Sequence, residues 1–218
     1  MLKSPAHGKI VLPVLSVAAL FFIGGCAATL YTAAQHGDSA TVRSLVAGGA
    51  DVNAHDDDGR TALMLAARQG RGAVVRMLLA DGAEVNAKDT YGTTALLEAS
   101  IGGYAAVVKM LLDAGADVNI TEDFRGVTPL MVAAKKGSDA CIRNLLGAGA
   151  SVNDADSAGT TALMGASMNG HEGAVRLLLA VGPDVTVKNH RGGTALSLAS
   201  RYGYEEIAKL LRKAGATE

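Results

Sequence analysis

The chain has 218 residues, of which 49% are apolar and only 4% aromatic, with no tryptophan. This length accommodates one or two domains, and any core must be built from Ala, Leu, Val and Met rather than from large rings. The formal net charge is −1, so the chain lacks the basic excess that nucleic-acid binding requires.

The first 25 residues have the pattern of a secretory signal peptide. Lys3 and Lys9 form a short positive region before an uncharged apolar run over 10–23, and this run is short of the roughly 20 residues that span a bilayer as a helix. The end of this run, Ile23-Gly24-Gly25-Cys26, resembles the lipobox of bacterial lipoproteins. The resemblance implies a signal peptide over 1–25, cleavage before Cys26 and lipidation of the Cys26 sulfur. A secretory signal cleaved elsewhere and an uncleaved anchor are the alternatives.

After Cys26, glycine recurs with a period of 33 or 34 residues. One set is Gly59, Gly92, Gly126, Gly159 and Gly192, and a second set in phase with it is Gly49, Gly82, Gly115, Gly149, Gly182 and Gly215. Each glycine of the first set precedes a Thr-Ala-Leu or Thr-Pro-Leu run. Such a regular period predicts stacked supersecondary units, because one unit cannot bury its apolar face alone.

Each unit is expected to contain two short helices. The Thr of each run, such as Thr61, is a good N-cap because its hydroxyl can accept a backbone N–H, and Pro129 fits the first turn of such a helix. A third glycine, such as Gly70 or Gly137, is expected to end the first helix in a left-handed turn. Residues 74–79 then have the apolar spacing of a second helix.

The Gly-x-Thr-Pro-Leu start and the Gly-Ala-Asp-Val-Asn close, which is complete at 49–53 and 115–119, resemble those of ankyrin repeats. The resemblance covers almost everything after Cys26 and implies an all-α ankyrin-repeat solenoid with short β-hairpin fingers. We expect one ankyrin-repeat domain over 26–218, and Glu122 is interpreted as an inserted residue. The six expected repeats are about 27–55, 56–88, 89–121, 123–155, 156–188 and 189–218.

The resemblance also implies that a protein partner binds the concave side, formed by the hairpin tips and the exposed ends of the first helices. These positions differ most between the repeats, whereas the framework positions hardly change. The predicted partner-binding residues are Asp57, Asp58, Arg60, Arg68, Tyr91, Phe124, Arg125, Lys135, Lys136, His190, Arg191, Arg201 and Tyr202.

Two chemical features stand out in this set. Tyr91, Phe124 and Tyr202 are candidate anchors because aromatic residues and Arg dominate interface hot spots, although each could instead pack along its own hairpin. The basic residues at the helix ends predict a strip that faces an acidic partner surface, with a solvated helix end as the alternative. They are Arg68, Lys135, Lys136 and Arg201.

No motif for catalysis, a metal or a cofactor is present. The acids at 56–58 lack the spacing of a calcium loop, and the chain has no nucleophile elbow, phosphate-binding glycine loop or zinc spacing. Cys141 takes an inner helical position and is expected in the core. We expect neither an enzyme nor a small-molecule or nucleic-acid binder.

The predicted function is a membrane-anchored interaction module of the bacterial cell envelope that binds an exported protein. The alternative is an inhibitor or immunity protein that neutralises an exported enzyme or toxin. Ala27 follows Cys26 in place of the Asp that resembles an inner-membrane retention signal. The expected location is therefore the outer membrane, facing the periplasm, or the outer face of the cell membrane in a single-membrane bacterium.

Overall fold

The computed structural model describes residues 30–217, so the predicted signal peptide and Cys26 lie outside the described residues. In this range the helices follow one another as six pairs. The first helices of the pairs are residues 30–36, α3 (Ala62–Arg68), α5 (Ala95–Gly102), α7 (Pro129–Lys136), α9 (Ala162–Met168) and α11 (Ala195–Arg201). The second helices are α2 (Ser39–Ala47), α4 (Gly72–Ala80), α6 (Ala105–Asp113), α8 (Asp139–Gly147), α10 (Glu172–Leu179) and α12 (Glu205–Lys213).

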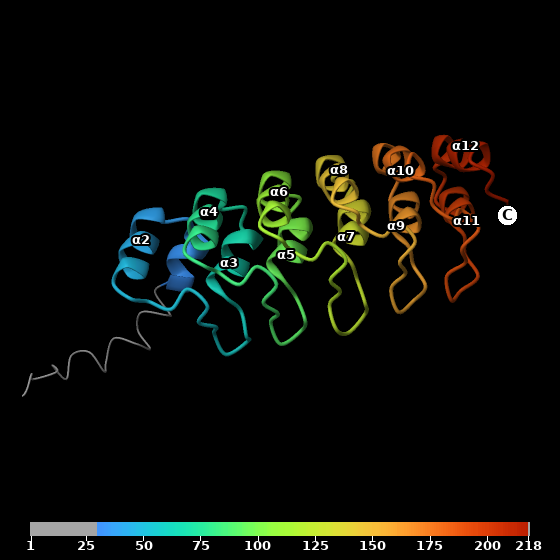
Figure 1. The fold of residues 1–218 in the computed structure, drawn as a ribbon. Coiled ribbons are helices and arrows are strands. Elements are labelled where there is room, and N and C mark those ends of the chain that lie inside the picture. The colour runs from blue at the N-terminus through green and yellow to red at the C-terminus, as the bar shows by residue number, and fades with distance from the viewer. Residues whose placement is uncertain (1–29, 218) are drawn as a thin grey trace, which may run out of the picture.

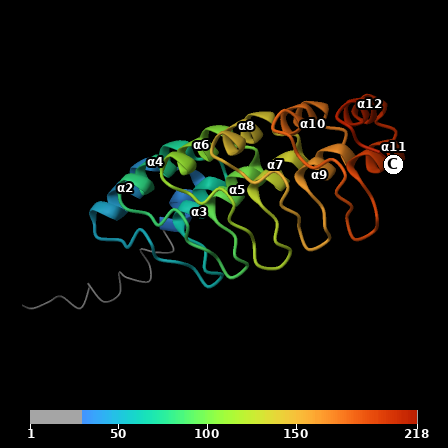
Figure 2. The same cartoon turned by 45° about the vertical axis from the view of Figure 1, so that its right-hand side comes forward.

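The pairs stack in chain order into an elongated solenoid (Figure 1), as predicted from the glycine period. From α3 onward each first helix contacts the next first helix, and from α2 onward each second helix contacts the next second helix. The hairpins between pairs all extend from the same side of the stack (Figures 1 and 2). The molecule therefore has three tiers, with second helices, first helices and hairpins in that order.

Local sequence signals set the bounds of the first helices. Thr128 caps α7 because its hydroxyl accepts the backbone N–H of Met131 at 3.2 Å, and Pro129 occupies the first turn. Gly137 then ends α7 in the left-handed conformation, with φ 68°. Thr hydroxyls cap the other first helices that follow a hairpin in the same way, and they belong to Thr61, Thr94, Thr161 and Thr194. The predicted N-caps are confirmed.

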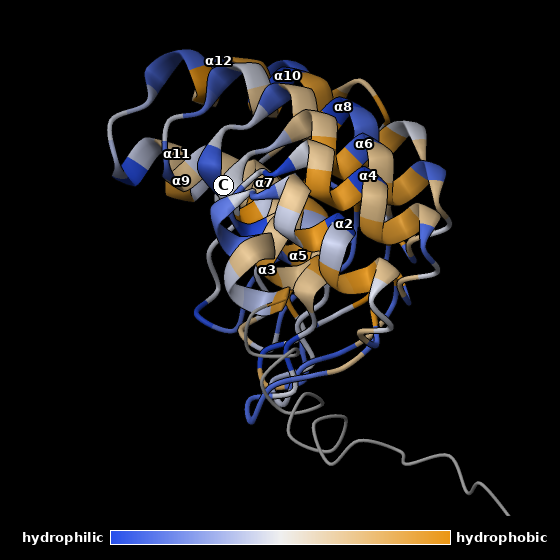
Figure 3. Ribbon diagram, turned by 90° about the vertical axis from the view of Figure 1, so that its left-hand side faces the viewer, coloured by the Kyte–Doolittle hydropathy of each residue, from blue (hydrophilic) through white to orange (hydrophobic). Residues whose placement is uncertain are grey.

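A continuous apolar core runs through the stack between the two helical tiers. The second residue of each first helix after a hairpin is a Leu with at most 2% exposure, as at Leu63, Leu96, Leu130, Leu163 and Leu196. Alanine is fully buried beside them, for example at Ala66 and Ala133, so neighbouring helices approach closely. Figure 3 shows that the orange, hydrophobic residues lie mostly in the helices and that the hairpins are largely blue or white.

Cys141 is completely buried in this core, as predicted, and burial raises the pKa of its thiol. Its position on α8 matches that of Val74 on α4 and Val107 on α6, which are also buried. Cys141 is therefore a packing residue, and its thiol stays protonated at neutral pH.

A ladder of asparagines joins the loops that follow the second helices. The Asn53 side chain accepts the backbone N–H of Glu84 at 2.8 Å and donates to the Gly82 carbonyl at 3.2 Å, one repeat further along. Asn86 makes the same two bonds with Asp117 and Gly115. Asn119 and Asn153 each accept the corresponding N–H of the following loop. Each repeat thus satisfies backbone groups of the next, which fixes their register.

The hairpins are simpler than the predicted β-hairpin fingers. Within residues 30–217 they hold isolated bridges, His55 with Thr61 and Ala155 with Thr161, and no longer strand. Single backbone bonds join neighbouring hairpins, as from the Thr90 N–H to the Asp58 carbonyl at 3.0 Å and from His190 to Ala158 at 3.0 Å. These bonds hold the tips side by side.

Gly137→Ala is expected to destabilise the solenoid by about 1–3 kcal/mol, because a left-handed backbone disfavours a side chain. The added Cβ would also lie 2.5 Å from Nδ1 of His171. Gly147→Ala is the matched control, since its Cβ meets nothing within 4 Å and the residue lies in α8. Urea unfolding followed by circular dichroism measures both. Equal midpoints for the two variants would show that Gly137 is not constrained.

Candidate functional site

The predicted partner-binding residues all lie on one surface, which is formed by the hairpins and the first helices and is called the inner face below. The hairpins carry Asp57, Asp58, Arg60, Tyr91, Phe124, Arg125, His190 and Arg191. The last turns or C-caps of first helices carry Arg68, Lys135, Lys136, Arg201 and Tyr202. Side chains that are up to 145 residues apart in the chain thus lie along one face of the solenoid, at different positions on its length.

A side-chain oxygen organises each hairpin turn, which the sequence analysis missed. Asp56 accepts the backbone N–H groups of Asp58 at 3.0 Å and Arg60 at 2.9 Å, and its second oxygen binds the Arg60 side chain. Burial alone would raise the pKa of Asp56, but the bonds from Arg60 outweigh it and hold that pKa below its ordinary value. Equivalent pairs of bonds end on Asp89, Asp156 and Asn189. The acidic run at 56–58 is thus a hairpin support.

Glu122 is not itself the inserted residue that the sequence analysis expects between repeats, because it holds the hairpin position that Asp56 has in another repeat. It is buried, and its carboxylate accepts the backbone N–H groups of Phe124 at 3.0 Å and Arg125 at 2.7 Å. Its own N–H donates to the Val127 carbonyl. Glu122 therefore supports its hairpin as Asp56 supports another, and the extra residue of this repeat enlarges the hairpin loop.

Tyr91 and Phe124 form an exposed aromatic pair across two neighbouring hairpins. Their ring centroids are 5.9 Å apart with an interplanar angle of 44°, and the residues remain 55% and 70% exposed. They pack against one another rather than each along its own hairpin. Such rings bury a large area at low entropic cost when a partner binds.

Glu98 is a largely buried carboxylate on the inner face, and the sequence analysis did not identify it. Its side chain is 13% exposed and lies 3.8 Å from the Arg68 guanidinium. Burial raises the pKa of Glu98, and the positive charge of Arg68 only partly opposes the shift. The signal in the sequence is a lone acid at a position where other first helices carry Leu65, Val132, Gly165 and Leu198.

The positive charges of the inner face are unequally compensated. Arg60 pairs with Asp56 at 2.8 Å and with Asp58 at 3.0 Å, and Arg68 faces Glu98. Further along the stack, the Arg125 guanidinium lies 3.5 Å from the Glu122 carboxylate. Within residues 30–217, no ion pair involves the four remaining predicted basic residues. These are Lys135, Lys136, Arg191 and Arg201. In register, Ile101 and Met168 separate the basic helix-end positions, so the predicted strip alternates between basic and apolar side chains.

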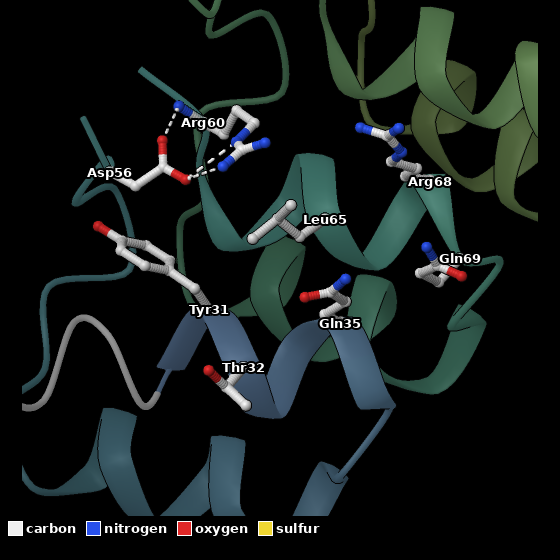
Figure 4. A pocket seen from close by; sticks show the side chains of 8 residues that line it. All are labelled: Tyr31, Thr32, Gln35, Asp56, Arg60, Leu65, Arg68 and Gln69. Atoms are coloured by element: carbon white, nitrogen blue, oxygen red, sulfur yellow. Dashed lines mark hydrogen bonds and ion pairs between the residues drawn. The ribbon is translucent and has the colours of Figure 1, made fainter. Parts of the chain in front are cut away.

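A cavity of about 500 Å³ lies at the N-terminal end of the inner face (Figure 4). Residues from two first helices and one hairpin line it, including Tyr31, Gln35, Asp56, Arg60 and Arg68. The Tyr31 ring extends toward Asp56, and its buried hydroxyl has no hydrogen-bond partner among the described residues. Burial, then the charges of Asp56 and Asp51, raise the pKa of Tyr31. Both arginines of this cavity face carboxylates, Arg60 that of Asp56 in the wall and Arg68 that of Glu98 beside it.

A second cavity, of about 390 Å³, lies at the C-terminal end of the same face and is called the C-terminal groove. It lies between the last two hairpins and the helices α9 and α11, and its wall includes the predicted residues His190, Arg191, Arg201 and Tyr202. Met168 and Leu198 supply apolar surface. Basic, aromatic and apolar side chains therefore meet in one concave site.

The described residues contain no group of three or more His, Cys, Asp or Glu side chains that could hold a metal ion. None of the helices within residues 30–217 has the length and hydropathy to span a bilayer. The chemistry of the inner face is that of hydrogen bonding, charge and apolar contact.

Stacked helix pairs with hairpins on one side define a repeat protein whose variable surface is suited to recognition. A model of ankyrin repeats in three copies matches residues 30–122 and 130–217, and the chain belongs to the ankyrin-repeat family. Ankyrin repeats are protein-interaction modules, and no enzymatic family is indicated. Among curated protein sequences, none matches the chain significantly.

Two solved structures illustrate the likeness. An ankyrin-repeat domain from Acinetobacter baumannii is 36% identical, with a TM-score of 0.79 over 87% of this chain and 98% of that one. A chain in the complex of the predatory endopeptidase Bd0816 from Bdellovibrio bacteriovorus with immunity protein Bd3460 is 34% identical, with a TM-score of 0.77. That match covers 84% of this chain and 96% of the other.

Glu98→Gln is expected to raise the melting temperature at pH 7 and to lose this advantage in acid. A carboxyl whose pKa is raised by folding costs stability above its ordinary pKa and nothing once both states are protonated. Gln is neutral throughout, so the difference between the variant and the natural protein should shrink as the pH falls below about 4. Thermal unfolding at both pH values measures it. A difference that grows in acid would contradict this account of Glu98.

Proposed function

We propose that the chain is a lipid-anchored protein-binding module of the bacterial cell envelope, and that its inner face binds an exported protein. The single observation that carries the binding claim is the separation of roles within the fold. Framework side chains cap, pack and join the repeats, whereas the inner face exposes an aromatic pair and basic residues, such as Lys135 and Lys136, that form no ion pair among the described residues. Aromatic and arginine side chains in such positions supply much of the energy of protein interfaces.

The anchoring proposal rests on the lipobox-like segment that ends at Cys26. Leu30 begins the first helix of the described chain only four residues later, so an extended link reaches at most about 14 Å. A lipidated Cys26 would hold the solenoid close to the bilayer. Because residue 27 is Ala rather than Asp, we propose the outer membrane, facing the periplasm, as the site of anchoring.

Cys26→Ser is expected to move the protein from the membrane fraction to the soluble periplasmic fraction, because acyl chains supply about 0.8 kcal/mol of membrane affinity per buried methylene. Fractionation of cells that express either form, followed by immunoblotting, measures the shift. The variant Cys141→Ser is the control, since Cys141 is buried in the core and has no part in anchoring. The same distribution for all three forms would rule out lipid anchoring at Cys26.

Reversal of both charges in Lys135→Glu/Lys136→Glu is expected to weaken partner binding by about tenfold or more, because the partner is proposed to present acidic surface to the inner face. The partner is first captured by crosslinking in intact cells and identified by mass spectrometry, and its affinity is then measured with purified proteins. Unchanged affinity would remove these two lysines from the interface. Failure to capture any protein by crosslinkers along the inner face would count against the module itself.

A second candidate function is that of an inhibitor or immunity protein for an exported enzyme or toxin. The observation that favours it is the similarity to a chain from an endopeptidase–immunity protein complex, at 34% identity over 96% of that chain. Inhibition of the captured partner at a one-to-one ratio would support this role. A partner without enzymatic or toxic activity would favour an adaptor that holds or stabilises an exported protein.

A further inference from the structure

The C-terminal groove has a chemistry that differs from the rest of the inner face. Its wall includes Arg191 and Arg201, which form no ion pair within residues 30–217. In the N-terminal cavity, by contrast, Arg60 is held by two carboxylates and Arg68 faces Glu98. The arginines at the N-terminal end of the inner face therefore face carboxylates of this chain, whereas those at the C-terminal end are available to carboxylates of a partner.

The hairpin supports increase this difference. Asp56 supports the hairpin beside the N-terminal cavity with an ionised side chain. In the last hairpin Asn189 does the same work, since its oxygen accepts the N–H groups of Arg191 at 3.0 Å and Gly193 at 2.9 Å. The amide satisfies the turn without a negative charge, so the charges of Arg191 and Arg201 remain uncompensated on that side. Asp156, in the other wall hairpin, accepts two backbone N–H groups through one oxygen, and among the described residues it forms no ion pair with Arg191 or Arg201.

The groove also offers apolar contact. Leu198 is 6% exposed at its base, Met168 is half-buried, and Tyr202 stands 53% exposed at its edge. A volume of about 390 Å³ falls within the range of roughly 300–1,000 Å³ typical of ligand pockets. The site therefore has room for one large apolar side chain and for the backbone on either side of it.

We propose that the C-terminal groove receives a segment of the partner in which an aromatic or large aliphatic side chain is flanked by carboxylates. This inference rests on the proposed function and specifies the partner chemistry that the inner face selects. The apolar side chain enters between Met168, Leu198 and Tyr202, and the carboxylates face Arg191 and Arg201. Guanidinium groups suit this task because they bind carboxylates through two parallel hydrogen bonds.

The probe is a fluorescent, end-capped peptide in which one Phe stands between two pairs of Glu, and its binding to the purified full chain is measured by fluorescence polarisation. Arg191→Glu/Arg201→Glu is expected to weaken binding by at least about tenfold. Arg43→Glu/Arg76→Glu is the matched control, because it changes the net charge equally at exposed sites on α2 and α4. The control is expected to change the affinity less than about twofold. A peptide with Ala in place of Phe should bind more weakly to the natural chain.

Equal losses in the two double variants would overturn the proposal, because they would show attraction by net charge alone. Absence of peptide binding, or indifference to the Phe→Ala change in the peptide, would overturn it as well. The proposed function is tested separately by the partner captured in cells. A captured partner whose affinity is unaffected by Arg191→Glu/Arg201→Glu would refute the groove and leave the binding module standing.

Discussion

Stacking of each repeat against the next is the constraint on which the rest of this structure depends. A single pair of short helices cannot bury its apolar face, so Leu63 and its equivalents are covered only when neighbouring repeats are present. The asparagine ladder adds a polar component, in which Asn53 and Asn86 satisfy backbone groups one repeat further along. Because the framework positions are committed to these contacts, variation between repeats falls at other positions, including those of the inner face.

The hairpins of the inner face are also held in place by contacts within the chain. Asp56, Glu122 and Asn189 each fix a hairpin from within, and backbone bonds between neighbouring hairpins align the tips. A surface that is ordered before binding loses less conformational entropy when a partner docks. The substitution of an amide for a carboxylate at position 189 further shows that one structural task can be met with different local charge, which leaves room to adjust recognition without altering the fold.

Much of the fold could be predicted from the sequence, because the framework signals repeat with a fixed period. The Thr caps, the left-handed glycines and the burial of Cys141 follow from positions that recur from one unit to the next. The hairpin supports were missed, although an Asp or Asn three residues before the hairpin glycine is visible in five repeats and is the support in four of them. The contact of Tyr91 with Phe124, the burial of Glu98 and the two cavities depend on packing between repeats, and no pattern within one repeat reveals them.

The central claim is that a protein partner binds the inner face, while the framework residues hold the repeats together and do not contact the partner. Hydrogen–deuterium exchange of the full chain, alone and in complex with the partner captured in cells, tests this claim most directly. The account predicts new protection in the hairpins and at the ends of the first helices, concentrated in residues 156–161 and 189–202. Protection confined to the second helices α4, α6, α8 and α10 would contradict it.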